Sequence, residues 1–187
     1  IKGTAMGMCI SVYFANCYMW DVTRKIRENP PEGTTTFLRY IDDILVIQLD
    51  GNRKTVEDIF KSITDEHTKY TIDPPAREAN FLDVTIYIGE SGQLETKPFS
   101  KPTATITFLH YRSNHPQHCR DAICYSQLIR LRRITTKTEF FEEAAEKITS
   151  AFIQRGYPRA LLTKYLKEVR KMSQEELLGP PSLRKQA

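Results

Sequence analysis

Two adjacent carboxylates, Asp42 and Asp43, are the residues whose type and setting point most directly to chemistry. They interrupt an apolar segment rich in Thr, Ile, Val and Leu, and carboxylates buried in such a segment need a compensating partner. A divalent cation would compensate them, because Mg²⁺ prefers carboxylate oxygens and paired metal ions assist phosphoryl transfer. The alternative is a solvated turn in which both side chains face water.

A second group of candidate residues is basic. The segment 110–133 holds five arginines and one aspartate, with two tyrosines interleaved. Such a run is typical of a surface that follows nucleic-acid phosphates and binds them without sequence preference. A solvated helix face is the alternative. The five arginines are Arg112, Arg120, Arg130, Arg132 and Arg133.

The histidines and cysteines suggest two further sites that the sequence does not favour. Those between positions 110 and 124 include no C-x₂-C pair, and His118 and Cys119 are adjacent, which disfavours binding of one zinc ion by both. Cys9 and Cys17 lie eight residues apart on a predicted helix, so we interpret them as small buried apolar residues. No motif places a base beside any cysteine.

The elements that must position these residues follow from the spacing of apolar side chains. Residues 8–28 predict a largely buried helix, which the two prolines at 30 and 31 end. Residues 36–41 and 44–49 predict two strands that fold back at the aspartates. A turn at 50–52 leads to a further predicted helix over 54–67.

The second half changes from strands to helices. Segments 81–88 and 93–99 predict a hairpin around the glycines at 89 and 92, and 103–109 predicts another extended segment. Residues 122–134, 138–154 and 159–172 all have helical spacing. Thr136 with Glu139 predicts a capping box, and Gly156 with Pro158 separates the last two helices.

Composition and charge narrow the class of protein. The 187 residues are 40% hydrophobic and 27% charged, which excludes collagen-like, low-complexity and wholly disordered chains. The sequence has no run of 18 apolar residues, so it predicts no membrane-spanning helix. Its four scattered cysteines favour a reducing, intracellular setting.

The two halves of the chain differ in charge. Residues 1–96 carry a net charge of −5 (10 basic, 15 acidic) and residues 97–187 carry +9 (17 basic, 8 acidic). The basic half suggests a polyanionic partner. The start of the chain, without Met or an apolar leader, suggests a piece of a longer protein.

Several short segments together resemble reverse transcriptases. Tyr40-Ile41-Asp42-Asp43 resembles the motif C hairpin, and Gly3-Thr4-Ala5-Met6-Gly7 resembles the motif B loop. The segment 80–86, with Phe81-Leu82-Asp83, resembles motif E. Lys101-Pro102-Thr103 and Ser113-Asn114-His115-Pro116 are similar to segments of the Penelope-like retroelement branch. We therefore expect the chain to be a fragment of a reverse transcriptase of that branch, which it resembles.

The resemblance implies an α+β fold and a role for each matched residue. Residues 1–100 would be part of a polymerase palm, an antiparallel sheet with helices; 101–176 would be a basic, helical, thumb-like region, and 177–187 a flexible tail. Asp42 and Asp43 would bind the metal, and Lys69 would lie near the leaving pyrophosphate. The nucleotide and template would contact Gly3, Ala5, Met6, Gly7 and Tyr40. The primer duplex would contact Phe81, Leu82, Asp83, Lys101, Arg112, Arg120, Arg130, Arg132 and Arg133.

The implied function is RNA-directed DNA synthesis, in which Mg²⁺ or Mn²⁺ supports primer extension with deoxynucleoside triphosphates. The partners would be an RNA template, a DNA primer and the upstream fingers and motif A segment, with no membrane, and the location the nucleus. Because motif A is not in this sequence, the fragment alone would be inactive. The alternative function is a non-catalytic nucleic-acid-binding remnant or repurposed domain, and a pure interaction domain is a third.

Overall fold

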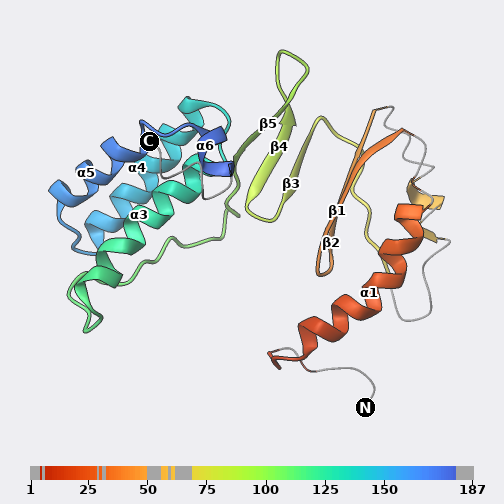
Figure 1. Cartoon of the computed structure of the whole chain (residues 1–187), viewed down its shortest axis with the longest axis horizontal. Coiled ribbons are helices and arrows are strands. Elements are labelled where there is room, and N and C mark those ends of the chain that lie inside the picture. Colours follow the sequence, from red (N-terminus) through yellow and green to blue (C-terminus); the bar gives the residue numbers. More distant parts are fainter. Residues whose placement is uncertain are drawn as a thin grey trace. The chain divides into compact units, whose positions relative to one another are not determined.

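In the computed structural model of the chain, helices and antiparallel strands make up the fold, in agreement with the predicted mixed α+β class (Figure 1). The chain divides into two compact units, Ile1–Arg77 and Glu78–Ala187, which we describe separately. The predicted change of character near residues 100–110 falls inside the second unit. No helix of the described part is long and apolar enough to cross a membrane. The structure describes residues 5, 7–28, 30, 33–49, 56–58, 60–61 and 69–179.

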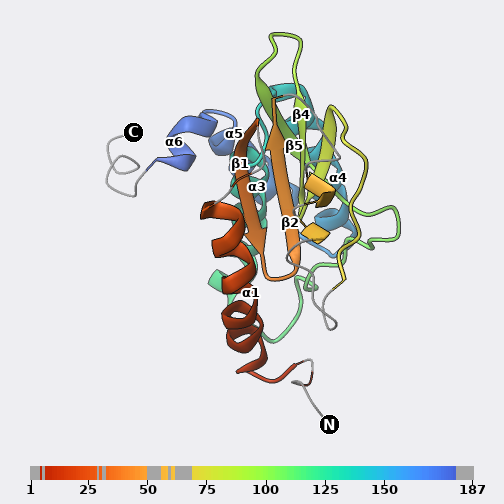
Figure 2. The same cartoon turned by 90° about the vertical axis from the view of Figure 1, so that its right-hand side faces the viewer.

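The first unit pairs a long helix with a β-hairpin. Helix α1 covers Ser11–Glu28, and strands β1 (Thr34–Tyr40) and β2 (Asp43–Gln48) pair antiparallel, with Tyr40 opposite Asp43. Figure 2 shows the hairpin alongside α1. The predicted helix and hairpin are therefore confirmed, whereas the turn at 50–52 and most of the helix predicted over 54–67 lie outside the described residues. The core of this unit consists of Met19, Ile26, Val56 and Phe60.

Helix α1 is less buried than its sequence predicts. Its second half buries Met19, Thr23 and Ile26, which are spaced at helical intervals and face the core. The expectation of a largely buried helix is wrong for the first half, and Cys9 and Cys17 are exposed rather than buried. A two-stranded hairpin covers one stripe of a helix, and periodicity alone cannot reveal how much of the helix it reaches. The large apolar and aromatic side chains exposed on α1 are Val12, Tyr13, Phe14, Tyr18 and Trp20, and Met8 and Ile10 just before the helix are exposed too.

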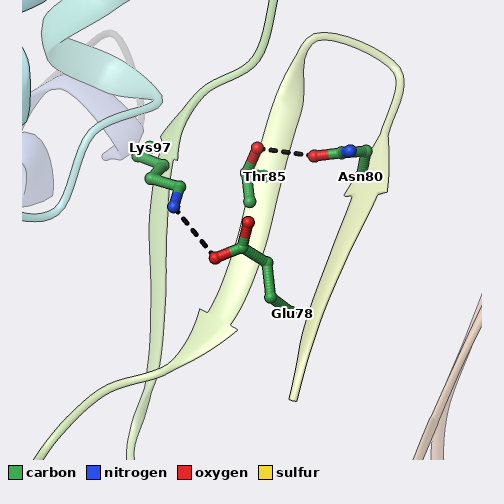
Figure 3. A network of polar contacts seen from close by, with 4 residues as sticks. All are labelled: Glu78, Asn80, Thr85 and Lys97. Atoms are coloured by element: carbon green, nitrogen blue, oxygen red, sulfur yellow. Dashed lines mark hydrogen bonds and ion pairs between the residues drawn. The ribbon is translucent and has the colours of Figure 1, made fainter. Parts of the chain in front are cut away.

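The second unit begins with a three-stranded antiparallel sheet in the order β3-β4-β5. Its strands are Glu78–Phe81, Val84–Ile88 and Leu94–Pro98. The hairpin predicted at residues 89–92 is confirmed. The single strand predicted over 81–88 is wrong, because a tight turn at Leu82 and Asp83 divides it and Leu82 has φ +57°. Figure 3 shows two polar contacts across the sheet, from Lys97 Nζ to Glu78 (2.9 Å) and from the Thr85 hydroxyl to Asn80 (2.6 Å).

Three helices and a short fourth complete the second unit. They are α3 (Gln117–Arg133), α4 (Thr138–Gln154), α5 (Arg159–Val169) and α6 (Gln174–Leu178). The predicted bounds of α4 are confirmed; α3 begins five residues earlier than predicted, and α5 ends three earlier. The sequence did not predict α6, although Ser173 and Glu176 form its capping box. The core between the helices is formed by Cys124, Leu128, Leu131, Phe141, Ala145, Ile148, Phe152, Tyr157, Leu162 and Val169.

Polar contacts fasten the sheet to the beginning of α4. Thr136 does not cap the helix as predicted: its hydroxyl accepts a hydrogen bond from the backbone N–H of Thr96 (3.0 Å), and Lys137 is the N-cap residue. Lys137 Nζ lies 2.9 Å from Glu95 Oε2. The extended segment predicted over 103–109 forms no strand and runs toward α3 as irregular chain (Figure 1). The sheet therefore contacts the N-terminal end of α4, and α5 follows its C-terminal end.

Candidate nucleic-acid interface

The turn at residues 155–158 joins α4 to α5 with a fixed backbone geometry. The N–H of Gly156 donates to the carbonyl of Ile153 (3.0 Å), and that of Tyr157 donates to the carbonyl of Phe152 (3.1 Å). These two bonds form a Schellman motif, which requires a left-handed residue at its centre. Gly156 supplies it with φ +82°. Pro158 then precedes the first residue of α5 and cannot extend α4.

Aromatic packing holds this turn against the core. Tyr157 is 3% exposed, and its ring centroid lies 4.8 Å from that of Phe152 and 4.9 Å from that of Tyr111. Phe108 stacks on the other side of Phe152 at 3.9 Å. Burial raises the pKa of Tyr157 and of Tyr111, so both rings stay uncharged in the neutral range. The turn is therefore a rigid connection.

Helix α5 presents a polar face that is basic. Leu162 and Val169 are buried against α3 and α4, so the opposite side of the helix faces solvent. In the described part of the chain, no carboxylate forms an ion pair with Arg159, Lys164 or Lys167. Because one side of α5 is packed on the core and its exposed side is positively charged, the helix is suited to contact a polyanion. Its exposed residues are Arg159, Ala160, Thr163, Lys164 and Lys167.

Comparison with known proteins agrees with this geometry. Residues 107–167, about a third of the chain, match the family model described as an animal helix-turn-helix domain. The match includes α3, α4 and most of α5, together with the turn at 155–158. Neither the curated proteins nor the solved structures include a significant match. A helix-turn-helix match suggests a nucleic-acid partner.

This match corrects the identification made from the sequence. The segment predicted to be a reverse-transcriptase thumb matches a helix-turn-helix domain instead, so the recognition of a Penelope-like reverse transcriptase is wrong. The helix-turn-helix match supports a nucleic-acid partner, which the sequence also predicted. It favours the alternative function, a nucleic-acid-binding domain, over polymerase catalysis.

The predicted metal ligands lie at the tip of the β1–β2 hairpin. Asp42 and Asp43 are both exposed, and Ile41 before them has φ +53°. Arg39 braces the hairpin by donating to the Thr23 hydroxyl (2.8 Å) and to the carbonyl of Ile41 (2.8 Å). Within the described residues, no three His, Cys, Asp or Glu side chains gather into a metal-binding group. The two carboxylates have the donor type that Mg²⁺ prefers, but the described residues around them do not complete a metal site.

The remaining residues predicted to bind nucleotide and primer are scattered. Ala5, Gly7, Tyr40 and Lys69 are all exposed, while Gly3 and Met6 lie outside the described residues. In the second unit, Phe81 ends β3, and Leu82 and Asp83 form the tight turn before β4. Lys101 lies exposed in the irregular chain after β5. Within the first unit, the structure brings Tyr40 beside Asp43 in the strand register.

Most of the five predicted phosphate-binding arginines contact the protein itself. Arg120 donates to the carbonyls of Tyr111 and Ser113, and Arg132 donates to the carbonyls of Met172 and Thr135. Arg130 forms an ion pair with Asp83. Arg133 is half-buried, whereas the side chain of Arg112 is exposed. Of the five predicted arginines, Arg112 is therefore the one whose side chain is exposed and has no protein partner in the described part of the chain.

Sequence reasoning missed the basic residues of α5. Arg159, Lys164 and Lys167 were counted in the charge of the second half but were not proposed as contacts. The signal that identifies them is the four-residue connection between two helical segments, with its central glycine and following proline. This spacing is typical of a helix-turn-helix, in which the second helix makes the contacts.

Proposed function

We propose that this protein binds double-stranded DNA through α4, the turn at 155–158 and α5, with α5 lying in the major groove. The observation that carries the proposal is the exposed basic face of α5, held by the rigid turn and by its buried Leu162 and Val169. DNA binding by α5 requires neither a metal ion nor a reaction.

The dimensions of α5 favour DNA over duplex RNA. An α-helix with its side chains is about 10–12 Å across, which matches the roughly 12 Å wide major groove of B-form DNA. The 11 residues of α5 extend about 16 Å along the groove at 1.5 Å per residue. The major groove of A-form RNA is too narrow for side chains to read.

The exposed residues of α5 divide between base and phosphate contacts. Arg159 and Thr163 lie one helical turn apart near the beginning of α5, where helix-turn-helix proteins contact base edges. An arginine can bond guanine at two acceptors, and a threonine can bond a base edge or pack on a thymine methyl group. We assign Lys164 and Lys167 to phosphates, because an ammonium group is a compact charge with little sequence preference.

The charge distribution of the second unit supports the same orientation. The first half of α4 carries Glu139, Glu142 and Glu143, close to the end that contacts the sheet. The turn and the beginning of α5 carry Arg155 and Arg159 at the other end of α4, whose 17 residues extend about 25 Å. The end of α5 returns to the acidic end, where Arg170 pairs with Glu142, so the beginning of α5 is the part best placed to meet DNA.

Fluorescence anisotropy with the full chain and labelled 20-base-pair duplexes tests the proposal. The chain should bind DNA more tightly than RNA of the same sequence, with affinity that falls steeply as salt rises. Lys164→Ala should weaken binding to every DNA sequence. Arg159→Ala should weaken binding by about tenfold on a selected sequence and less on random DNA.

Two control variants make the result specific. Lys171→Ala removes an exposed lysine that lies beside Met172, at the end of α3 away from the turn, and should leave affinity unchanged. Asp42→Asn should also leave DNA binding unchanged. Metal-dependent catalysis at Asp42 and Asp43 stays a prediction, and DNA-binding measurements do not test it. No binding by the unaltered chain, or equal losses from Lys164→Ala and Lys171→Ala, would contradict the proposal.

A further inference from the structure

The loop at residues 110–116, which precedes α3, is fixed directly against the helix-turn-helix turn. The backbone N–H of Tyr111 donates to the carbonyl of Arg155 at 2.9 Å. The imidazole of His110 lies so close to Gly156 that a Cβ atom there would be 3.6 Å from it. Residues about 45 positions apart in the sequence thus meet where α5 begins.

Arg120 braces this loop from α3. Its guanidinium donates to the carbonyls of Tyr111 and Ser113, the residues on either side of Arg112, and lies 5.1 Å from the centre of the Tyr111 ring. The Tyr111 hydroxyl in turn donates to Asp121 at 3.1 Å. These contacts occupy Arg120 and Asp121 within the protein and fix the backbone around Arg112.

Arg112 itself is left available. Its side chain is exposed, and its backbone N–H donates to His110 Nδ1 (3.1 Å), which fixes the start of the side chain. The 25 residues from 96 to 120 contain no Asp or Glu, so no acidic group of the loop repels a phosphate. The braced backbone needs no reordering when Arg112 binds, and the planar fork of an arginine matches two phosphate oxygens.

We propose that this loop is a second DNA contact, in which Arg112 binds a backbone phosphate beside the groove that α5 enters and Arg120 is the positioning residue. The inference rests on the proposed function. Its role is to fix the register of α5 on the duplex, because phosphate contacts orient a protein while base contacts read the sequence. The ligand is a DNA phosphodiester, without preference for sequence.

Arg112→Gln tests the contact, with Lys171→Gln as the matched control. Arg112→Gln should weaken binding about fivefold on selected and unrelated duplexes alike. One lost phosphate contact lowers the magnitude of the slope of log affinity against log salt by about 0.9. The ratio of the DNA affinity of the unaltered chain to that of Arg112→Gln should therefore fall about threefold between 50 and 200 mM salt. Lys171→Gln should change neither quantity.

A double-mutant cycle tests the role of Arg120. Both bonds to the carbonyls come from one nitrogen of Arg120, Nη1, so Arg120→Met, which removes the donor and keeps most of the side-chain length, should release the loop. In that background, Arg112→Gln should cost less than twofold, because the phosphate contact is already weakened. Circular dichroism establishes whether Arg120→Met is folded. If it is not, Tyr111→Phe, which removes the hydrogen bond to Asp121, takes its place in the cycle.

The outcomes separate this inference from the proposed function. If Lys164→Ala weakens binding and Arg112→Gln does not, α5 binds DNA and the loop contact is refuted. If Arg112→Gln costs fivefold in both backgrounds, Arg112 binds phosphate and the positioning role of Arg120 is refuted. If the unaltered chain does not bind duplex DNA, the proposed function fails and this inference fails with it.

Discussion

Replacement of Gly156 by alanine tests the turn on which the proposed DNA contact depends. At φ +82°, an L-residue is disfavoured by about 1–2 kcal/mol. The new Cβ would lie 3.6 Å from His110 and 3.9 Å from Tyr111, which are ordinary van der Waals distances, so no steric overlap adds to this cost. We therefore expect Gly156→Ala to destabilise the second unit by about 1 kcal/mol, and Gly156→Asn by less, because Asn tolerates this backbone conformation.

Amide hydrogen exchange measures this change in the second unit alone. The single tryptophan, Trp20, lies on α1 and reports unfolding of the first unit, which should be unaffected. Amides of α4 and α5 should exchange about fivefold faster in Gly156→Ala, the equivalent of about 1 kcal/mol. Gly179→Ala is the control, because Gly179 has φ −62° and any residue adopts that backbone. Unchanged or slower exchange in Gly156→Ala would refute the left-handed turn.

Four further predictions concern stability and reactivity. The pKa of Glu95 is lowered by hydrogen bonds from Tyr87 and Lys137, so its contribution to stability should be complete above pH 4.5 and disappear as the pH falls further; Glu95→Gln should abolish this dependence in acid unfolding curves. Burial, followed by the hydrogen bond to Glu95, raises the pKa of Tyr87 to about 12, so its contribution should persist to pH 10 and be lost toward pH 12, except in Tyr87→Phe. Burial raises the pKa of the Cys124 thiol to about 11, so a thiol reagent at neutral pH should label Cys9 and Cys17 first and Cys124 only after unfolding; early labelling of Cys124 would contradict its buried position. Arg39 donates to Thr23, Asn16 and the carbonyl of Ile41, so Arg39→Ala should destabilise the first unit by about 2 kcal/mol in urea unfolding followed by Trp20 fluorescence, and an unchanged midpoint would show that the bracing contacts are absent.

Elements with strong local periodicity were predictable from the sequence. Phe141, Ala145, Ile148 and Phe152 recur at helical intervals, and all four are buried on one face of α4. Thr136 shows the limit of prediction from local sequence pattern. Its spacing from Glu139 fits a capping box, but its hydroxyl is bonded to Thr96, forty residues away in the chain. Local pattern cannot reveal such a competing partner.

The short motifs failed for a related physical reason. Asp42 and Asp43 lie exposed at a hairpin tip, and Leu82 and Asp83 form a tight turn, where such residue types are common whether or not they have a further role. Three to five residues of this kind resembled polymerase motifs without sharing the family. The contacts of Arg120 and Arg132 could not be predicted either, because these side chains donate to backbone carbonyls, which every residue has.

An amide exchange footprint on the full chain would show whether α5 and the turn before it contact DNA. Amide exchange would be compared with and without a saturating 20-base-pair duplex at low salt. We expect slower exchange in α5, in residues 155–158 and in the loop at 110–116, with no change in β1, β2 or the sheet. Protection confined to the β1–β2 hairpin, or the absence of protection in α5 at saturation, would contradict the proposed DNA contact.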